Sequence, residues 1–254
     1  MTLQENELIK IRRDLHQIPE IGLEEYETSD YLLKIINGLP QENLEIKRWK
    51  TAILVHLNGE NKNYTIGYRT DIDGLPVEEK TGLPFSSKHE GRMHACGHDI
   101  HMTVALGVCL LLREQLKSGA VRVIFQPAEE KGLGALKVLE YGIIDQLQYL
   151  FSLHVRPIQE LADGHHSPAL MHGASRTYVG EIIGLEAHDA RPHLGINPIE
   201  VGASIVHTLA GIKHNPTIPA SIKLTRFQAG GEAANVIPGR AVFSIDVRAQ
   251  TNEL

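Results

Sequence analysis

The sequence has little of what marks several classes of protein. Its 254 residues include one tryptophan, two cysteines and only 5% aromatic residues. Two cysteines cannot build a disulfide framework, and a reducing compartment would keep Cys96 and Cys109 as thiols. The N-terminal ten residues lack the cationic start and apolar run of a secretory signal. We therefore expect a cytoplasmic protein.

Long apolar runs and basic stretches are also missing. The longest apolar run, residues 104–112, is half of the roughly 18 residues that a membrane span needs. The 25 basic and 31 acidic residues give a net charge of −6, without a basic patch for nucleic acid or an anionic membrane. These absences exclude nucleic-acid and membrane partners and leave small molecules as the expected ligands.

Helical patterns alternate with short apolar runs through the first two-thirds of the chain. Helices are predicted for residues 7–17, 24–38, 100–116 and 132–140, and strands for residues 52–57, 65–68, 121–125 and 147–155. The last two strands are apolar enough to be buried. Alternating helices and apolar strands favour an α/β domain over residues 1–172, with a mixed sheet covered by helices on both faces.

A second, smaller α+β domain is predicted for residues 173–254. Its pattern is a strand at 175–185, a helix from 198 to about 213, and strands at 221–228 and 240–249. Asn197 as N-cap and Pro198 at the first helical position mark the start of that helix. Residues 250–254 resemble the beginning of a further helix, so we expect both domains to continue beyond the sequence.

Fourteen histidines are the most unusual feature of the composition, because histidine is the commonest metal ligand. Polar residues gather at the ends of predicted strands and at the start of the long helix, at residues 69–74, 93–101, 125–130 and 154. Each cluster alone has an ordinary alternative, a solvated loop or a hydrogen-bonded core histidine. Together they indicate one site, because ligands of open α/β sheets bind outside the carboxyl ends of the strands.

The same clusters carry a resemblance to a known family. Asp71-Ile72-Asp73-Gly74, His94-Ala95-Cys96-Gly97-His98-Asp99, Gln126-Pro127-Ala128-Glu129-Glu130 and Leu153-His154-Val155 are similar, in order and spacing, to the motifs of the di-metal amidohydrolases. That family includes aminoacylases, hippurate hydrolases, auxin-conjugate hydrolases and N-acetyldiaminopimelate deacetylases. The resemblance implies a metallo-aminopeptidase-like catalytic domain, followed by a lid or dimerisation domain.

Eight positions match functional residues of the family. The resemblance implies metal ligands at Cys96, His98, Glu130 and His154, a general base at Glu129, a site-orienting carboxylate at Asp71, and substrate contacts at His188 and Asn235. It places Asp99 as a partner that holds an imidazole tautomer, and gives His101 no role as a ligand. Two divalent ions are implied, for which zinc, manganese, cobalt or nickel would suit the donors. Family members extend further and supply a last histidine ligand there.

The resemblance implies a hydrolase that removes the acyl group from N-acyl amino acids and forms a homodimer through the second domain. The N-terminal half is most similar to N-acetyldiaminopimelate deacetylases of lysine biosynthesis, whereas the part after Leu153 is closer to general aminoacylases. A dipeptidase or carboxypeptidase of the same family is an alternative. A further alternative is a non-catalytic fragment that retains only part of the metal-binding scaffold.

Overall fold

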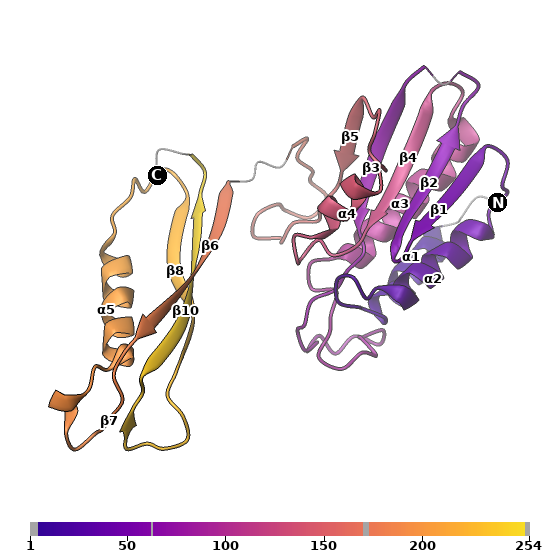
Figure 1. The fold of residues 1–254 in the computed structure, drawn as a ribbon. Coiled ribbons are helices and arrows are strands. Elements are labelled where there is room, and N and C mark those ends of the chain that lie inside the picture. Colours follow the sequence, from indigo (N-terminus) through magenta and orange to yellow (C-terminus); the bar gives the residue numbers. More distant parts are fainter. Residues whose placement is uncertain (1–4, 62, 170–172, 252–254) are drawn as a thin grey trace. The chain divides into compact units, whose positions relative to one another are not determined.

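The computed structural model describes residues 5–61, 63–169 and 173–251. The chain divides into two compact units, Met1–Gly164 and His165–Leu254 (Figure 1). The domain boundary expected near Gly173 stays a prediction, since residues 170–172 lie outside the described part, as do residues 252–254 of the expected last helix. In the described part of the chain, no helix is long and apolar enough to cross a membrane.

A five-stranded mixed sheet forms the centre of the first unit. Its strands are β1 (Leu44–Trp49), β2 (Ala52–Asn58), β3 (Thr65–Asp71), β4 (Ala120–Gln126) and β5 (Tyr149–Ser152), in the order β1-β2-β4-β3-β5. β4 is antiparallel to β2 and parallel to β3, and β3 is parallel to β5. The carboxyl ends of β3, β4 and β5 therefore lie at one edge of the sheet.

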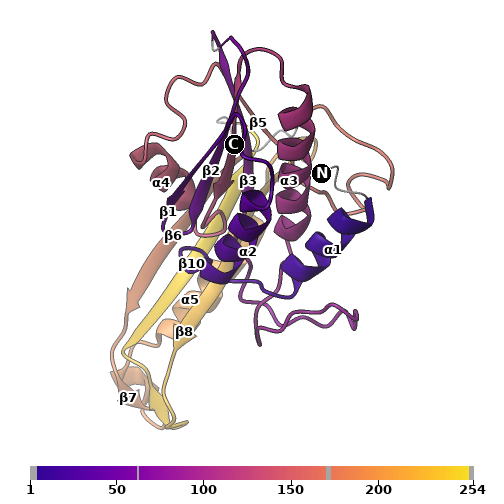
Figure 2. The same ribbon diagram turned by 90° about the vertical axis from the view of Figure 1, so that its right-hand side faces the viewer.

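Helices cover both faces of this sheet, as predicted. α1 (Glu5–His16), α2 (Tyr26–Asn37) and α3 (His98–Gln115) lie on one face, and the short α4 (Gly134–Glu140) lies on the other (Figure 2). Alternate side chains of β2 explain this division. Ile53 and Val55 join the main core with the first three helices, whereas Leu54 packs with Val138 of α4.

Two strands of the first unit differ from the sequence-based expectation. Residues 147–155 were expected to form a buried strand, but β5 covers only Tyr149–Ser152 and all four of its residues are exposed. It is the edge strand of the sheet, and an apolar run alone cannot distinguish an edge strand from a central one. β1 was not predicted, because charged residues at positions 45, 47 and 48 obscure its alternation.

The second unit is a three-stranded antiparallel sheet with one long helix. β6 (Ala174–Ile183), β10 (Arg240–Ala249) and β8 (Ala220–Ala229) lie in that order, and α5 (Pro198–Gly211) packs beside them (Figure 1). A short pair, β7 (Ala187–His188) and β9 (Val236–Ile237), forms a separate ribbon. The Asn197 side chain accepts the Ile199 N–H at 3.0 Å, which confirms the predicted N-cap. This is the expected α+β arrangement.

Candidate metal centre

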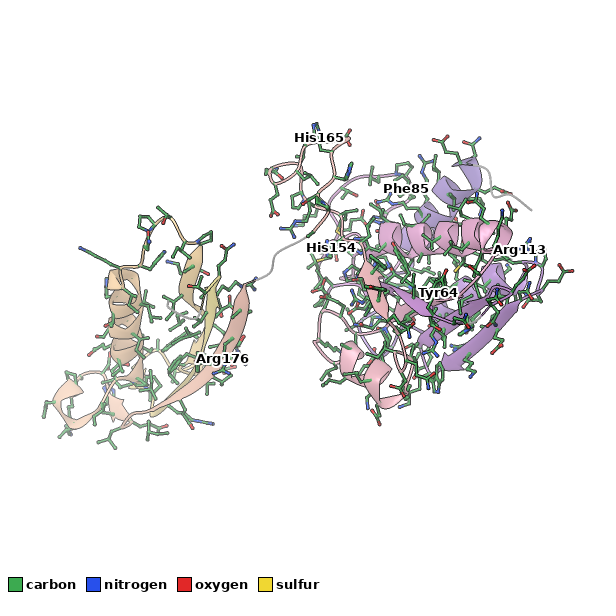
Figure 3. All side chains as sticks on the ribbon, turned by 90° about the horizontal axis from the view of Figure 1, so that it is seen from above. Tyr64, Phe85, Arg113, His154, His165 and Arg176 are labelled. Carbon is green, nitrogen blue, oxygen red and sulfur yellow. The ribbon has the colours of Figure 1, made fainter. Side chains whose placement is uncertain are left out.

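Polar side chains gather at the carboxyl ends of the three parallel strands. Asp71 ends β3, Glu129 and Glu130 lie in the loop after β4, and His154 follows β5. α3 begins at His98 on the same edge. In Figure 3, His154 lies beside the N-terminal end of α3, opposite Arg113 at the other end of that helix. The fold therefore brings four separate sequence clusters together in the first unit.

Cys96, His98 and Glu130 form one group of candidate ligands. Their donor atoms all lie within 4.8 Å of one another, and His98 Nε2 is 3.8 Å from Glu130 Oε1. His98 Nδ1 donates to the Asp73 carbonyl at 2.8 Å, so the lone pair is left on Nε2. This buried Nε2 has no hydrogen-bond partner among the described residues. Such an orphaned nitrogen fits a metal ligand.

The turn at Gly97 sets the spacing of these ligands. Gly97 has φ of 79°, in the left-handed region that glycine adopts without penalty, and it directly precedes α3. A Cβ at this position would lie 2.5 Å from the Val155 Cγ2 atom. The turn places Cys96 before the helix and His98 in its first turn. No other residue type fits both the conformation and the space.

A second group consists of His98, His101 and His154. The rings of His101 and His154 are 4.5 Å apart between centroids. His154 Nδ1 donates to the Val155 carbonyl at 2.6 Å, which leaves its Nε2 available as a ligand. His101 differs, since its Nδ1 lies 2.7 Å from Asp71 Oδ1 and its Nε2 accepts the Val155 N–H at 2.9 Å. Both ring nitrogens of His101 are therefore hydrogen-bonded, one to Asp71 and the other to the Val155 N–H.

Burial and neighbouring charged groups shift the pKa values of three side chains at this edge. Burial, and then the hydrogen bond and charge of Glu130, raise the pKa of the Cys96 thiol to about 12. Burial and the adjacent Glu130 also raise the pKa of Glu129. Burial alone would raise the pKa of Asp71, but the His101 hydrogen bond and the charges of His98 and Arg69 lower it to about 2. A divalent cation would neutralise this excess charge, so the donor set fits a metal.

Sequence reasoning missed His16, which supports the start of α3 from α1. Its Nδ1 lies 2.7 Å from Asp99 Oδ2, and its Nε2 lies 3.2 Å from Glu79 Oε1. The hydrogen bond with Asp99 raises the pKa of the buried His16 against the opposing effect of burial. The partners are 83 and 63 residues away in the sequence, so no local spacing could reveal them. Asp99 thus contacts an imidazole other than the candidate ligands His98 and His154.

The two predicted substrate contacts come together in the second unit. β7 pairs with β9, with His188 opposite Val236, and the Asn235 Nδ2 atom lies 3.4 Å from His188 Nε2. His188 Nδ1 also lies 2.9 Å from the Asp189 carboxylate. Both His188 and Asn235 are exposed. The structure therefore presents them as one polar pair on the short ribbon.

A thiol, an imidazole and a carboxylate within 4.8 Å of one another, beside a second carboxylate, fit the site of a metal-dependent hydrolase. Residues 67–233 match the family described as peptidase family M20/M25/M40. The chain belongs to this family, which confirms the resemblance to metal-dependent amidohydrolases.

Similar curated proteins extend along the whole chain. A protein of Ligilactobacillus salivarius named N-acetyldiaminopimelate deacetylase is 58% identical and matches 100% of this chain and 68% of its own length. A protein of the same name from Listeria monocytogenes is 40% identical over 98% of this chain and 68% of its own length.

Solved structures share the fold. The Bacillus subtilis YXEP protein, described as a dinuclear metal-binding peptidase of family M20, has a TM-score of 0.70 and 34% identity, covering 98% of this chain and 65% of that one. The aminopeptidase PepT of Bacillus cereus has a TM-score of 0.64 with 16% identity, over 100% of this chain and 69% of its own, and shares the fold alone.

Proposed function

We propose that the protein hydrolyses the amide bond of an N-acyl amino acid, with N-acetyldiaminopimelate as substrate in lysine biosynthesis. The observation that carries the proposal is the Cys96, His98 and Glu130 donor set, with Glu129 directly beside it. The name of the similar Ligilactobacillus protein supports the choice of substrate. A general aminoacylase would share this site and differ in the acyl amino acids that it accepts.

Four residues hold the metal in this proposal, namely Cys96, His98, Glu130 and His154. This donor set accommodates zinc, manganese, cobalt or nickel, and two ions are proposed. When bound, a divalent ion supplies a Lewis acid that polarises the amide carbonyl and acidifies water. Asp71 holds His101 at 2.7 Å and thereby orients the site.

Glu129 is the proposed general base and acid. It accepts a proton from the attacking water and then donates that proton to the amide nitrogen, because an amine leaves poorly until it is protonated. Water adds to the carbonyl carbon, the C–N bond breaks, and a carboxylate and an amine are released. Burial and the neighbouring Glu130 raise the pKa of Glu129. A raised pKa lies closer to neutral pH, where one carboxyl group can both accept a proton and return it.

His188 and Asn235 are proposed to bind substrate from the second domain, which we place at residues 173–254. Their side chains offer a donor and an acceptor pair suited to a substrate carbonyl or carboxylate. A cytoplasmic homodimer that associates through this domain is also proposed. Exposed apolar side chains on the edge strand β6, including Val179 and Ile183 at 73% and 72% exposure, support it.

The first test is tightly bound metal per chain, measured by elemental analysis of the purified protein beside Cys96→Ala. The proposal expects near-stoichiometric metal that is lost in the variant. N-acetyldiaminopimelate, other N-acyl amino acids and dipeptides are then compared as substrates. Preference for a dipeptide would replace the proposed activity with a peptidase activity. A protein that binds no metal after reconstitution would be a non-catalytic scaffold.

The second test replaces the proposed base. Glu129→Gln is expected to lower kcat by about a hundredfold to ten-thousandfold, while metal content stays unchanged because Glu129 is not a ligand. The matched control is Glu140→Gln, an exposed glutamate of α4 that pairs with Lys137. Normal turnover by Glu129→Gln would assign the base to another residue.

A further inference from the structure

The loop that carries Glu129 contains an unusual backbone conformation. Ala128, directly before the proposed base, has φ of 50°. This left-handed region is disfavoured for a residue with a Cβ, and alanine has no side-chain hydrogen bond to compensate. Ala128 is completely buried. Surrounding groups must therefore hold this peptide in place.

Glu25 supplies such a group from a distant part of the chain. Its side chain is fully buried, and its Oε1 accepts the Ala128 N–H at 2.8 Å across 103 residues of sequence. Burial raises the pKa of Glu25, against the effect of its hydrogen bonds. A buried carboxyl group destabilises the fold unless its contacts compensate. The Ala128 N–H provides such a contact, and the Thr51 side chain is a further hydrogen-bond partner of this carboxyl group.

The segment before α2 also packs directly against the loop. A Cβ on Gly22 would lie 2.7 Å from the Ala128 Cα atom, so the two backbones are in close contact. Lys131 Nζ donates to the Gly22 carbonyl at 2.7 Å. On the other side of Glu129, the Glu130 N–H donates to Asp73 Oδ2 at 3.0 Å. Two carboxyl groups thus hold the backbone N–H groups of Ala128 and Glu130, the residues before and after Glu129.

We propose that Glu25 is a positioning residue, whose carboxyl oxygen holds the Ala128 peptide in its left-handed conformation and so aims Glu129 at the reaction site. The inference rests on the proposed function of Glu129 as base. It requires an oxygen acceptor at position 25 and does not require a negative charge. Glutamine, which retains an oxygen at the same distance from the backbone, should replace glutamate, whereas methionine of similar size should not.

The kinetic test compares Glu25→Gln and Glu25→Met. Glu25→Gln is expected to keep kcat within about threefold, whereas Glu25→Met lowers kcat about a hundredfold with KM unchanged, because small displacements of a reacting group have effects of this size. Glu24→Met, an exposed neighbour, is the matched control and should keep normal turnover. Wild-type kcat in Glu25→Met would overturn the proposal, and so would equal losses in both Glu25 variants.

A second variant tests the backbone conformation itself. Glycine adopts φ of 50° without penalty, so Ala128→Gly added to Glu25→Met should restore kcat by roughly tenfold or more. A purely structural defect from the loss of Glu25 would not be repaired in this way. If the double variant folds but Ala128→Gly restores no turnover, the proposal that Glu25 acts by holding the Ala128 backbone conformation is wrong.

Hydrogen exchange tests the contact without any turnover. The Ala128 amide should be protected in the wild type and in Glu25→Gln, and should exchange at least roughly tenfold faster in Glu25→Met. Equal protection in all three proteins would overturn the inference. A fully active Glu129→Gln would instead overturn the proposed base and leave the exchange result standing, so the two failures are distinguishable.

Discussion

Asp71 accepts a 2.7 Å hydrogen bond from the Nδ1 atom of His101. The proton must lie on Nδ1, because the Val155 N–H donates to Nε2 of the same ring. This chain of contacts links the end of β3 to α3 and then to the peptide after His154. These contacts hold the segment that carries the candidate ligand His154, and His101 itself is not a ligand. Asp71 is a buried anion in this arrangement.

Acid should remove the stabilisation that Asp71 provides. The pKa of Asp71 is about 2 in the folded protein against an ordinary value of 3.8, so its contribution is complete above about pH 5 and is lost as the pH falls towards 2. We expect about 2 kcal/mol at pH 6, falling by roughly half at pH 3. Urea unfolding of wild type and Asp71→Asn at each pH, with a chelator present, measures this difference.

Asp30→Asn is the control for this prediction. Asp30 is an exposed carboxylate paired with Arg48, and an exposed pair contributes only about 0–1 kcal/mol. Its pH dependence of unfolding should follow that of the wild type. A constant free-energy difference between wild type and Asp71→Asn from pH 6 to pH 3 would contradict the assigned shift.

Metal binding should release the Cys96 proton. The ligand is the thiolate, and the pKa of this thiol is about 12, so binding near pH 8 displaces one proton and metal affinity rises about tenfold per pH unit. The pKa of His98 is also raised, by Asp73 and Asp71 against the effect of burial, so a second proton steepens the dependence at lower pH. Calorimetric titrations in buffers of different ionisation enthalpy count these protons.

Cys96→Asp and Cys109→Ala test the assignment of that proton. An aspartate is already ionised, so Cys96→Asp should release about one proton fewer than the wild type. Cys109 lies fully buried in the core on α3, and its removal should leave the proton count unchanged. If Cys96→Asp released as many protons as the wild type, the thiol would not be a ligand.

Local patterns could be predicted from the sequence wherever neighbours along the chain determine the structure. The Asn197 and Pro198 start of α5 and the strand at residues 240–249 are of this kind, and both are confirmed. The gathering of polar residues at the strand ends also followed from the sequence, because parallel strands with polar carboxyl ends imply a shared edge. These features depend on residues within a few positions of one another, or on one general rule of α/β sheets.

Contacts between distant residues could not be predicted. β4 lies between β2 and β3, two strands that precede it in the sequence. The sequences of the individual strands do not specify this order. Glu25 and Ala128 are 103 residues apart, and the left-handed conformation of Ala128 has no signature in an alanine. The residues that hold the candidate site in place can therefore be identified only from the fold, whereas the candidate ligands could be predicted from the sequence.

The packing of α5 on its sheet depends on a missing side chain at Gly202. A Cβ there would lie 2.4 Å from the Phe227 ring, whereas one at Gly211, in the last turn of the same helix, would meet nothing within 4 Å. We expect Gly202→Ala to destabilise the second unit by about 1–3 kcal/mol through overpacking. Gly211→Ala should stabilise it by about 0.5–1 kcal/mol, since alanine loses less conformational entropy in a helix. Thermal unfolding of both variants beside the wild type measures the two shifts, and a neutral Gly202→Ala would mean that α5 moves freely away from β8.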